Sequence, residues 1–262
     1  MNASTAPEDR PEDRPESRPE SRFVASVVDG PVATVTWSRP ERRNAIGQEV
    51  CDELVAALEW LAPRPEIGVV VLRAAGRPFC AGWDVTDFER LAGADPEALA
   101  SFFRHGRRLL AAISALPQVT VAAPAGLVLG FGCALLARCD LVIAADDSRF
   151  GLPEIRLGMP PATVLPELLS VMTRRAALEW AVTGERFDAR RAMADGLVTS
   201  VVPAADHDEE TARVVGLLSG HPDGAVRATK ELVGRLAAAD EGERVALGVE
   251  SALRRFAGQA PA

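Results

Sequence analysis

The stretch TVAAPAGLVLGFGCALLARCD, residues 120–140, decides the fold of this chain. An apolar run ends in Gly126, a turn with further glycines follows, and a second apolar run of helical length comes after it. Glycine lets main-chain N–H groups approach a ligand closely, and the first turn of a helix has free donors with a favourable dipole. The stretch therefore predicts a strand, a ligand-facing loop and a helix in succession.

The same order occurs once earlier in the chain. GVVVLRAAG (68–76) is a short apolar run of the kind found in buried parallel strands, and the loop RPFCAGWDV (77–85) follows it. A repeated strand, glycine loop and helix predict an α/β core whose loops follow the strand ends on one side, where ligands bind.

The rest of the chain divides into three predicted parts. Residues 1–22 contain a four-residue repeat of proline and mixed charges (7–22) and are expected to be a disordered tail. Residues 23–200 form the α/β core and residues 201–262 a helical C-terminal region. Apolar periodicity predicts strands at 23–28, 31–37, 141–146 and 196–203, helices at 48–61, 96–115, 162–171, 173–183 and 189–195, an irregular segment at 150–161, and helical structure over 207–257.

Composition excludes several classes of function. The net charge of −8 and pI near 5.1 argue against a protein that binds nucleic acid or an anionic membrane. No apolar span approaches the roughly 20 residues of a membrane helix, and the N-terminus has no signal-peptide pattern, so we expect a cytoplasmic protein. Four cysteines without C-x-x-C spacing predict buried free thiols and no metal site, and the three histidines are expected at the surface.

Several familiar uses of a glycine loop do not fit residues 126–140. A phosphate loop needs Gly-Lys-Ser/Thr where Gly132-Cys133-Ala134 stands, and a dinucleotide fingerprint needs a glycine at Leu135. Neither glycine loop has the serine of a nucleophile elbow. A backbone oxyanion hole remains, in which two N–H groups from separate loops stabilise a carbonyl oxygen as it gains negative charge.

Five motifs in register resemble those of the crotonase superfamily, the enoyl-CoA hydratase/isomerase family. They are FCAGWDV (79–85), residues 126–140, FGLPEIRLGMPP (150–161), Arg39-Pro40 with Arg43-Asn44-Ala45, and Thr183-Gly184 through Gly196-Leu197-Val198. The resemblance covers residues 23–257. It implies a spiral of β-β-α units with a helical C-terminal trimerisation region, and a homotrimer or a dimer of trimers. The implied substrate is an acyl-CoA or acyl carrier protein thioester, with no tightly bound cofactor.

The resemblance also implies a role for individual residues. The oxyanion hole would use the main-chain N–H groups of Trp83 and Phe131, whose rings either reshape the acyl pocket or point away from it. Trp83 could also be a core aromatic residue, Asp84 a loop acceptor, and Arg42 and Arg43 solvated loop charges. The substrate and CoA positions that the resemblance implies are Arg42, Arg43, Ala45, Ala81, Gly82, Asp84, Val85, Thr86 and Gly130.

One of the two carboxylates that hydratases of this family use is missing. Glu154 matches the second, whereas Ala134 stands at the position of the first. Because one base beside an oxyanion hole can take a proton from one carbon and return it to another, the site favours double-bond isomerisation. Hydration or dehydration, decarboxylation through the same enolate, and a non-catalytic thioester-binding scaffold remain as alternatives. The P-A-T sequence after Met159 resembles members that act on branched acyl groups.

Overall fold

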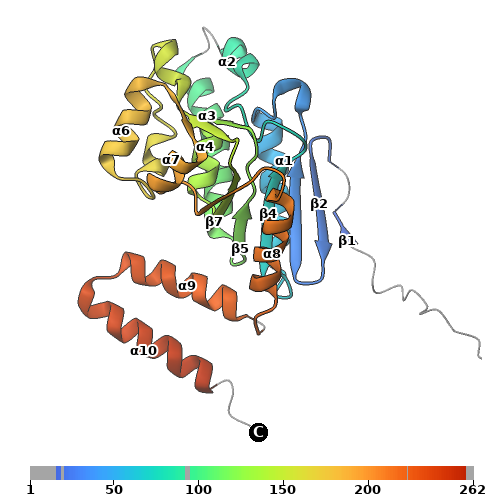
Figure 1. Cartoon of the computed structure of the whole chain (residues 1–262), viewed down its shortest axis with the longest axis vertical. Helices are drawn as coiled ribbons and strands as arrows, with labels where there is room; N and C mark the ends of the chain where they lie inside the picture. The colour runs from blue at the N-terminus through green and yellow to red at the C-terminus, as the bar shows by residue number, and fades with distance from the viewer. Residues whose placement is uncertain (1–15, 19–20, 92–94, 223, 258–262) are drawn as a thin grey trace, which may run out of the picture.

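The computed structural model describes residues 16–18, 21–91, 95–222 and 224–257, and its larger sheet holds seven strands over these residues (Figure 1). Their order is β1-β2-β3-β4-β5-β7-β10, with an antiparallel β2–β3 hairpin and parallel pairing from β3 to β10. The strands are β1 (Glu16–Ser17), β2 (Val24–Asp29), β3 (Val32–Trp37), β4 (Val69–Ala74), β5 (Val119–Ala122), β7 (Leu141–Ala145) and β10 (Ser200–Val202). The predicted α/β class and the hairpin are confirmed.

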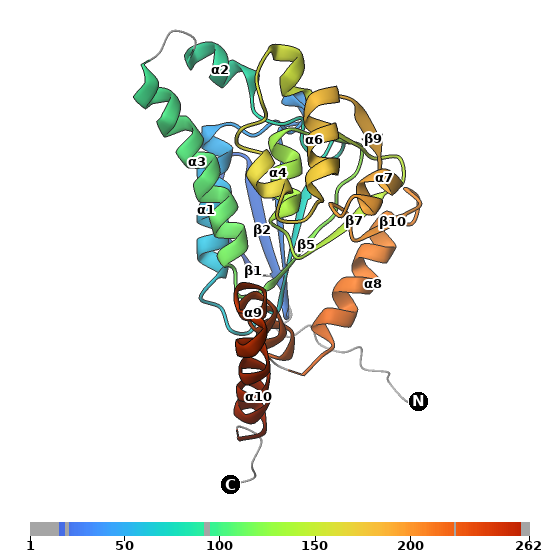
Figure 2. The same cartoon turned by 90° about the vertical axis from the view of Figure 1, so that its left-hand side faces the viewer.

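Helices cover both faces of this sheet, with α1 (Gln48–Leu61) and α3 (Pro96–Ala115) on one side and α8 (His207–Ser219) on the other (Figure 2). Strand β4 shows why its sequence is continuously apolar. Val70 and Leu72 belong to the core that α1 completes, while Val69 and Val71 pack in the cluster that includes Val215 of α8. Alternate residues therefore face two different apolar layers, as in other parallel sheets.

A second, three-stranded sheet has the order β6-β8-β9, and the sequence did not predict it. Its strands are β6 (Leu127–Leu129), β8 (Arg149–Gly151) and β9 (Arg186–Asp188). A strand of three residues is too short to show the alternation of apolar and polar residues that predicts a strand. For this reason β6 was not recognised within the glycine-rich segment, and β8 overlaps the segment predicted to be irregular. Helix α4 (Phe131–Ala137) follows β6, and the 3₁₀ helix η3 (Pro153–Leu157) follows β8.

Two further sequence predictions need correction. The helix expected over 162–171 is reduced to α5 (Leu165–Leu168), because the flanking N–H groups of Val164 and Ser170 bond three residues back and tighten the chain into turns. His207 is not a surface residue: it is buried, and its Nε2 lies 2.8 Å from the Ile143 carbonyl oxygen. The remaining elements are η2 (Pro40–Arg42), α2 (Val85–Leu91), α6 (Arg174–Thr183), α7 (Ala189–Ala194), α9 (Ala225–Ala238) and α10 (Glu241–Ala257).

Part of the predicted tail takes a place in the sheet. Residues 1–15 and 19–20 lie outside the described residues, but Glu16 and Ser17 pair with Val28 and Val27 of β2. The Glu16 carboxylate accepts two hydrogen bonds from Arg64, both of 2.7 Å. A bidentate ion pair thus holds a segment that has no apolar side chain to bury.

Helices α9 and α10 form a hairpin that extends beyond one end of the sheet (Figures 1 and 2). Val245, Val249 and Leu253 lie at intervals of four on α10, and these residues are 72%, 55% and 63% exposed. Lys230 of α9 connects the hairpin to the core, since its Nζ lies 2.6 Å from Asp140 Oδ2 and 2.9 Å from the Gln118 carbonyl oxygen.

Replacing Lys230 with Ala should destabilise this attachment by about 1–3 kcal/mol, because Asp140 loses a charged partner and the Gln118 carbonyl oxygen loses a donor. Urea unfolding measures the loss. Arg235→Ala is the control: it removes an ion pair with Glu250 inside the hairpin and should cost under about 1 kcal/mol. Equal losses in the two variants would contradict a specific anchoring role for Lys230.

Candidate active site

Parallel pairing brings three loops together. Val128 of β6 pairs with Phe150 of β8, and an isolated parallel bridge joins Cys80 to Val128. Because the three segments run in the same direction, the residues that follow them arrive at one edge. Trp83, Phe131 and Glu154 are therefore neighbours in space, although the chain separates Trp83 from Glu154 by about 70 residues.

The first loop presents the backbone of Trp83 to the second loop. Ile46 donates its N–H to the Gly82 carbonyl and accepts from the Asp84 N–H, both at 2.9 Å. In a parallel bridge of this kind the N–H of the residue between, Trp83, points to the opposite side. Gly82 lies on that side against the Leu129 carbonyl, since a Cβ at Gly82 would lie 3.1 Å from that oxygen. The backbone that precedes Trp83 thus lies against the turn at residue 130.

The second loop places Phe131 at the start of a helix. Gly130 has φ 50° and ψ −117°, a conformation that suits glycine, and its N–H donates to the Gly151 carbonyl at 2.9 Å. Phe131 is the first residue of α4, so its N–H has no acceptor within the helix. The backbones of the two loops, at Gly82 and Gly130, therefore lie close together.

Glu154 of η3 is the carboxylate at this site. A Cβ at Gly130 would lie 2.6 Å from Glu154 Oε1, so the absence of a side chain at Gly130 makes room for the acid. Oε2 is buried and has no hydrogen-bond partner among the described residues. Burial raises the pKa of Glu154, and its own backbone N–H only partly offsets this effect. The group is a partly desolvated carboxylate beside the turn at Gly130, which is suitable for proton transfer.

Ala134, where the second carboxylate is missing, lies in α4 and is completely buried in the apolar core. Its neighbours Cys133 and Leu135 are also buried there. The first turn of α4 therefore provides a methyl group where a second acid would have been needed to hold water.

The rings of Trp83 and Phe131 stack on each other, with centroids 3.9 Å apart and an interplanar angle of 23°. Phe131 is 1% exposed and Phe102 of α3, whose ring centroid lies 4.7 Å from that of Trp83, is 4% exposed. Trp83 itself is only partly buried and packs against the main core. Both rings thus turn toward α3, and the sequence alone left this direction open.

The two segments expected to bind CoA lie side by side. The Ala81 N–H donates to the Arg43 carbonyl at 3.1 Å, and a cavity of about 420 Å³ opens nearby. Arg42 and Arg43 are exposed, Ala45 and Gly82 buried, Ala81 and Thr86 half-buried, and Val85 exposed. The cavity is lined by Arg22, Phe23, Arg39, Arg42, Gly47, Gln48, Glu49, Asp52, Asp84, Thr86, Asp87 and Arg90.

Charges in this cavity are largely compensated. Ion pairs with acidic side chains engage three of its arginines, Arg22, Arg39 and Arg90, and Arg42 has no ion pair with a described residue. The sequence reasoning missed these three arginines. Arg22 stands at the end of the predicted tail and Arg90 beyond the recognised motif, and only the position of Arg39 next to Pro40 gave a signal.

Asp84 is a hydrogen-bond acceptor within its own loop, which was one of the two roles predicted for it. It accepts hydrogen bonds from the Thr86 N–H (3.0 Å) and Oγ1 (2.7 Å) and pairs with Arg39 at 2.9 Å. Burial alone would raise the pKa of Asp84, but Thr86 and Arg39 together hold it below its usual value. A carboxylate held in this way is a poor proton carrier at neutral pH.

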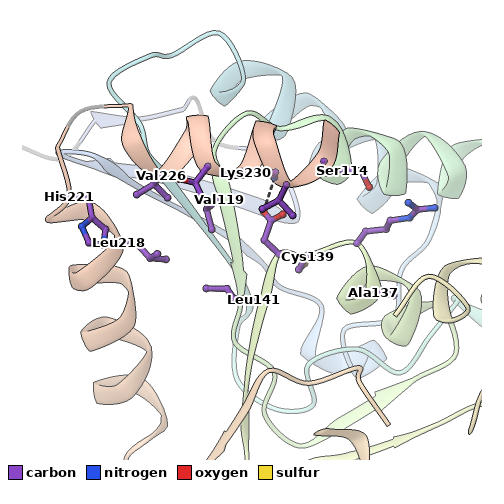
Figure 3. A pocket seen from close by; sticks show the side chains of 14 residues that line it. Ser114, Val119, Ala137, Cys139, Leu141, Leu218, His221, Val226 and Lys230 are labelled. Carbon is purple, nitrogen blue, oxygen red and sulfur yellow. Dashed lines mark hydrogen bonds and ion pairs between the residues drawn. The ribbon is translucent and has the colours of Figure 1, made fainter. Parts of the chain in front are cut away.

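Another cavity, of about 640 Å³, lies away from these residues (Figure 3). Its wall includes Val119 and Leu141, the first residues of β5 and β7, together with α9 and the ion pair of Lys230. It therefore lies at the amino ends of these strands, whereas Trp83, Phe131 and Glu154 belong to loops that follow strands.

The four cysteines are free, and three of them, Cys51, Cys80 and Cys133, are buried, while Cys139 is half-buried. Burial raises the pKa of Cys80 and Cys139 to about 12. Across the described parts of the chain, no cluster of three or more His, Cys, Asp or Glu side chains could hold a metal ion. None of the helices in those parts is both long and apolar enough to cross a membrane.

Comparison with known proteins gives a consistent result. The family model described as enoyl-CoA hydratase/isomerase matches residues 28–253. A probable enoyl-CoA hydratase of Mycobacterium bovis is 35% identical over 208 residues, 79% of each chain. The hydroxycinnamoyl-CoA hydratase-lyase of Pseudomonas fluorescens is 33% identical over 74% of this chain and 72% of its own. The crystal structure of an enoyl-CoA hydratase from Mycobacterium smegmatis superimposes with a TM-score of 0.86 at 30% identity, over 92% of this chain and 93% of that one.

Proposed function

This chain belongs to the enoyl-CoA hydratase/isomerase family and is an acyl-CoA enzyme, and we propose that it moves the double bond of an enoyl-CoA thioester. The observation that carries the proposal is one carboxylate, Glu154, whose Oε2 is buried and unpartnered among the described residues next to the turn at Gly130, with Ala134 in place of a second acid. Such a site can form and protonate an enolate without an acid that positions water.

The proposed reaction has two proton transfers. The Glu154 carboxylate removes a proton from C2 of a 3-enoyl thioester, and the electrons move to the thioester oxygen, giving a dienolate. The N–H groups of Trp83 and Phe131 stabilise this negative charge. Protonated Glu154 then donates the proton to C4, so the double bond moves to C2–C3 and the carboxylate is regenerated.

Incubation with 3-enoyl-CoA and 2-enoyl-CoA in heavy water tests the proposal. Isomerisation should move the double bond of the 3-enoyl substrate and introduce deuterium at C4 or C2, without formation of a hydroxyacyl product. Loss of the double bond by addition of water would contradict isomerisation. Absence of any proton exchange from a bound thioester would instead support the scaffold alternative.

Hydration is the second candidate, and the names of the similar proteins favour it. The relatives from Mycobacterium bovis and Pseudomonas fluorescens are named a hydratase and a hydratase-lyase. In this chain a hydratase would have to activate water with Glu154 and a partner outside the first turn of α4, since Ala134 offers no acid. The heavy-water experiment separates the two reactions by their products.

We assign CoA recognition to the segments 42–45 and 81–86. The assignment is supported by the hydrogen bond from Ala81 to Arg43, by the exposure of Arg42 and Arg43, and by the cavity that Arg42 lines together with Thr86. Arg42 and Arg43 have no ion pair with a described residue, so both remain able to meet phosphate groups. The phosphate groups of CoA are suitable partners for these arginines. The two exposed arginines therefore favour CoA over a carrier protein as the group to which the acyl chain is attached.

The acidic limb of the pH profile should lie above the ordinary range of a glutamate. Because burial raises the pKa of Glu154, the base becomes protonated and inactive at a higher pH than an exposed glutamate would. The pH dependence of kcat/KM measures this. The same shift stabilises the folded chain at low pH, since the native state binds the proton more tightly. Circular dichroism at each pH should therefore show a folded protein, and an acidic limb near pH 4 would contradict the assignment.

We also propose that the α9–α10 hairpin forms the contacts of a homotrimer or a dimer of trimers. The exposed apolar residues of α10, Val245, Val249 and Leu253, support this, because a row of this kind in water favours a partner helix. Sedimentation measurements of the full chain test it, and a monomer at micromolar concentration would contradict it.

A further inference from the structure

The side chains of Trp83 and Phe131 have to lie next to the acyl group of the proposed substrate. Their N–H groups would hold the thioester oxygen at about 3 Å. The acyl carbons next to that carbonyl are then within a few bond lengths of the two Cβ atoms. The volume that these two side chains occupy is therefore not available to the acyl chain.

The two rings form a closed block with α3. A centroid separation of 3.9 Å leaves no gap between Trp83 and Phe131 for another group. Phe102 contacts the indole from α3, with ring centroids 4.7 Å apart. Phe131 and Phe102 are buried and Trp83 is partly exposed, so Trp83 is the residue of this block that an acyl chain can contact.

Gly106 of α3 makes room for this arrangement. A Cβ at Gly106 would lie 2.3 Å from Trp83 Cη2 and 2.6 Å from Cζ2, and 3.2 Å from Phe131 Cε2. Glycine inside a helix is less favourable than alanine, but here it provides the space in which the indole packs. The position of the Trp83 ring is thus fixed by the backbone of α3 on one side and by Phe131 on the other.

We propose that Trp83, packed over Gly106, limits the length of the acyl group, so that this site takes short-chain thioesters. The inference rests on the proposed function, because that function places the thioester oxygen at the N–H groups of Trp83 and Phe131. A long acyl chain that extends from the carbonyl would contact the indole of Trp83. The indole cannot move toward α3 to make room, because it packs against Gly106, Phe102 and Phe131.

Binding of saturated acyl-CoA thioesters, which cannot isomerise, tests the proposal by calorimetry. The wild-type chain should bind butanoyl-CoA about tenfold or more tightly than octanoyl-CoA. Trp83→Ala should reverse this order, because each additional methylene that becomes buried strengthens binding severalfold. Trp60→Ala is the control: this indole packs against Arg64, with the guanidinium 4.0 Å from the ring centroid, and its loss should leave the ratio unchanged.

A second variant keeps the test decisive if Trp83→Ala folds poorly. Gly106→Ala should push the indole into the acyl space and weaken butanoyl-CoA binding about tenfold or more, while binding of CoA itself stays unchanged. Equal binding of butanoyl-CoA and octanoyl-CoA by the wild type, or an unchanged ratio in both variants, would overturn the length limit. If binding depended on the length of the acyl chain but no thioester of any length exchanged a proton, the proposed reaction would be wrong and the limit on acyl-chain length would still be supported.

Discussion

Replacing Glu154 with Gln should lower the turnover of an enoyl thioester by about 10²–10⁴-fold, because the amide cannot accept the proton from C2. Substrate binding should change little, since Glu154 Oε2 has no hydrogen-bond partner among the described residues and the amide has nearly the same size. The loss should therefore appear in kcat and leave KM close to its original value. Steady-state kinetics with the best 3-enoyl substrate gives both constants.

Glu185→Gln is a matched control for this experiment. Glu185 is an exposed acid directly before β9, the strand that pairs with β8, so the same chemical change occurs outside the site. Its turnover should match that of the wild type. If Glu154→Gln retained wild-type kcat, the base would have to be another group and the proposed mechanism would be wrong.

Gly130→Ala should also inactivate the enzyme, through geometry and not through the loss of a chemical group. The new Cβ would lie 2.6 Å from Glu154 Oε1 and would force the carboxylate away. The backbone conformation at φ 50° and ψ −117° is also unfavourable for a residue with a side chain, with a strain energy of about 1–3 kcal/mol. The turn that precedes the Phe131 N–H should therefore shift as well. Losing one oxyanion donor typically lowers kcat by about 10²–10³-fold, and we expect a loss of at least this size.

Gly30→Ala separates backbone strain from the collision with Glu154. Gly30 has φ 53°, close to that of Gly130, but nothing lies within 4 Å of its added Cβ. This variant should lose stability in urea unfolding and keep its kcat. If Gly30→Ala and Gly130→Ala lost activity equally, global destabilisation would explain the effect, and the proposed contact between Gly130 and Glu154 would have no role in it.

The sequence predicted those features that depend on local pattern. The continuous apolar run of β4 and the glycines after it predicted a buried strand and a loop, and the structure has both. The absence of a side chain at Gly130 has a clear reason in the neighbouring carboxylate. Glu154 could be proposed as the base because its flanking residues were recognisable, while its burial and raised pKa required three-dimensional packing.

Features made by distant segments could not be predicted in this way. The pairing of Val128 with Phe150 joins strands of three residues, and nothing in either sequence specifies the other. The same is true of the stacking of Trp83 on Phe131, because it depends on the space that Gly106 leaves in α3. A glycine in the middle of a predicted helix was the single signal of that arrangement, and its meaning appears only with the indole beside it.

The ion pair of Lys230 has a consequence for the amine chemistry of the whole chain. Lys230 is the one lysine among 29 lysine and arginine residues, and its ammonium group lies between Asp140 and the Gln118 carbonyl. Thioesters acylate free amines but not guanidinium groups, which stay protonated at neutral pH. An enzyme that holds acyl-CoA thus keeps its one side-chain amine paired with Asp140, while arginines carry the other basic charges. Acylation of Lys230 would therefore report the opening of α9 from the core.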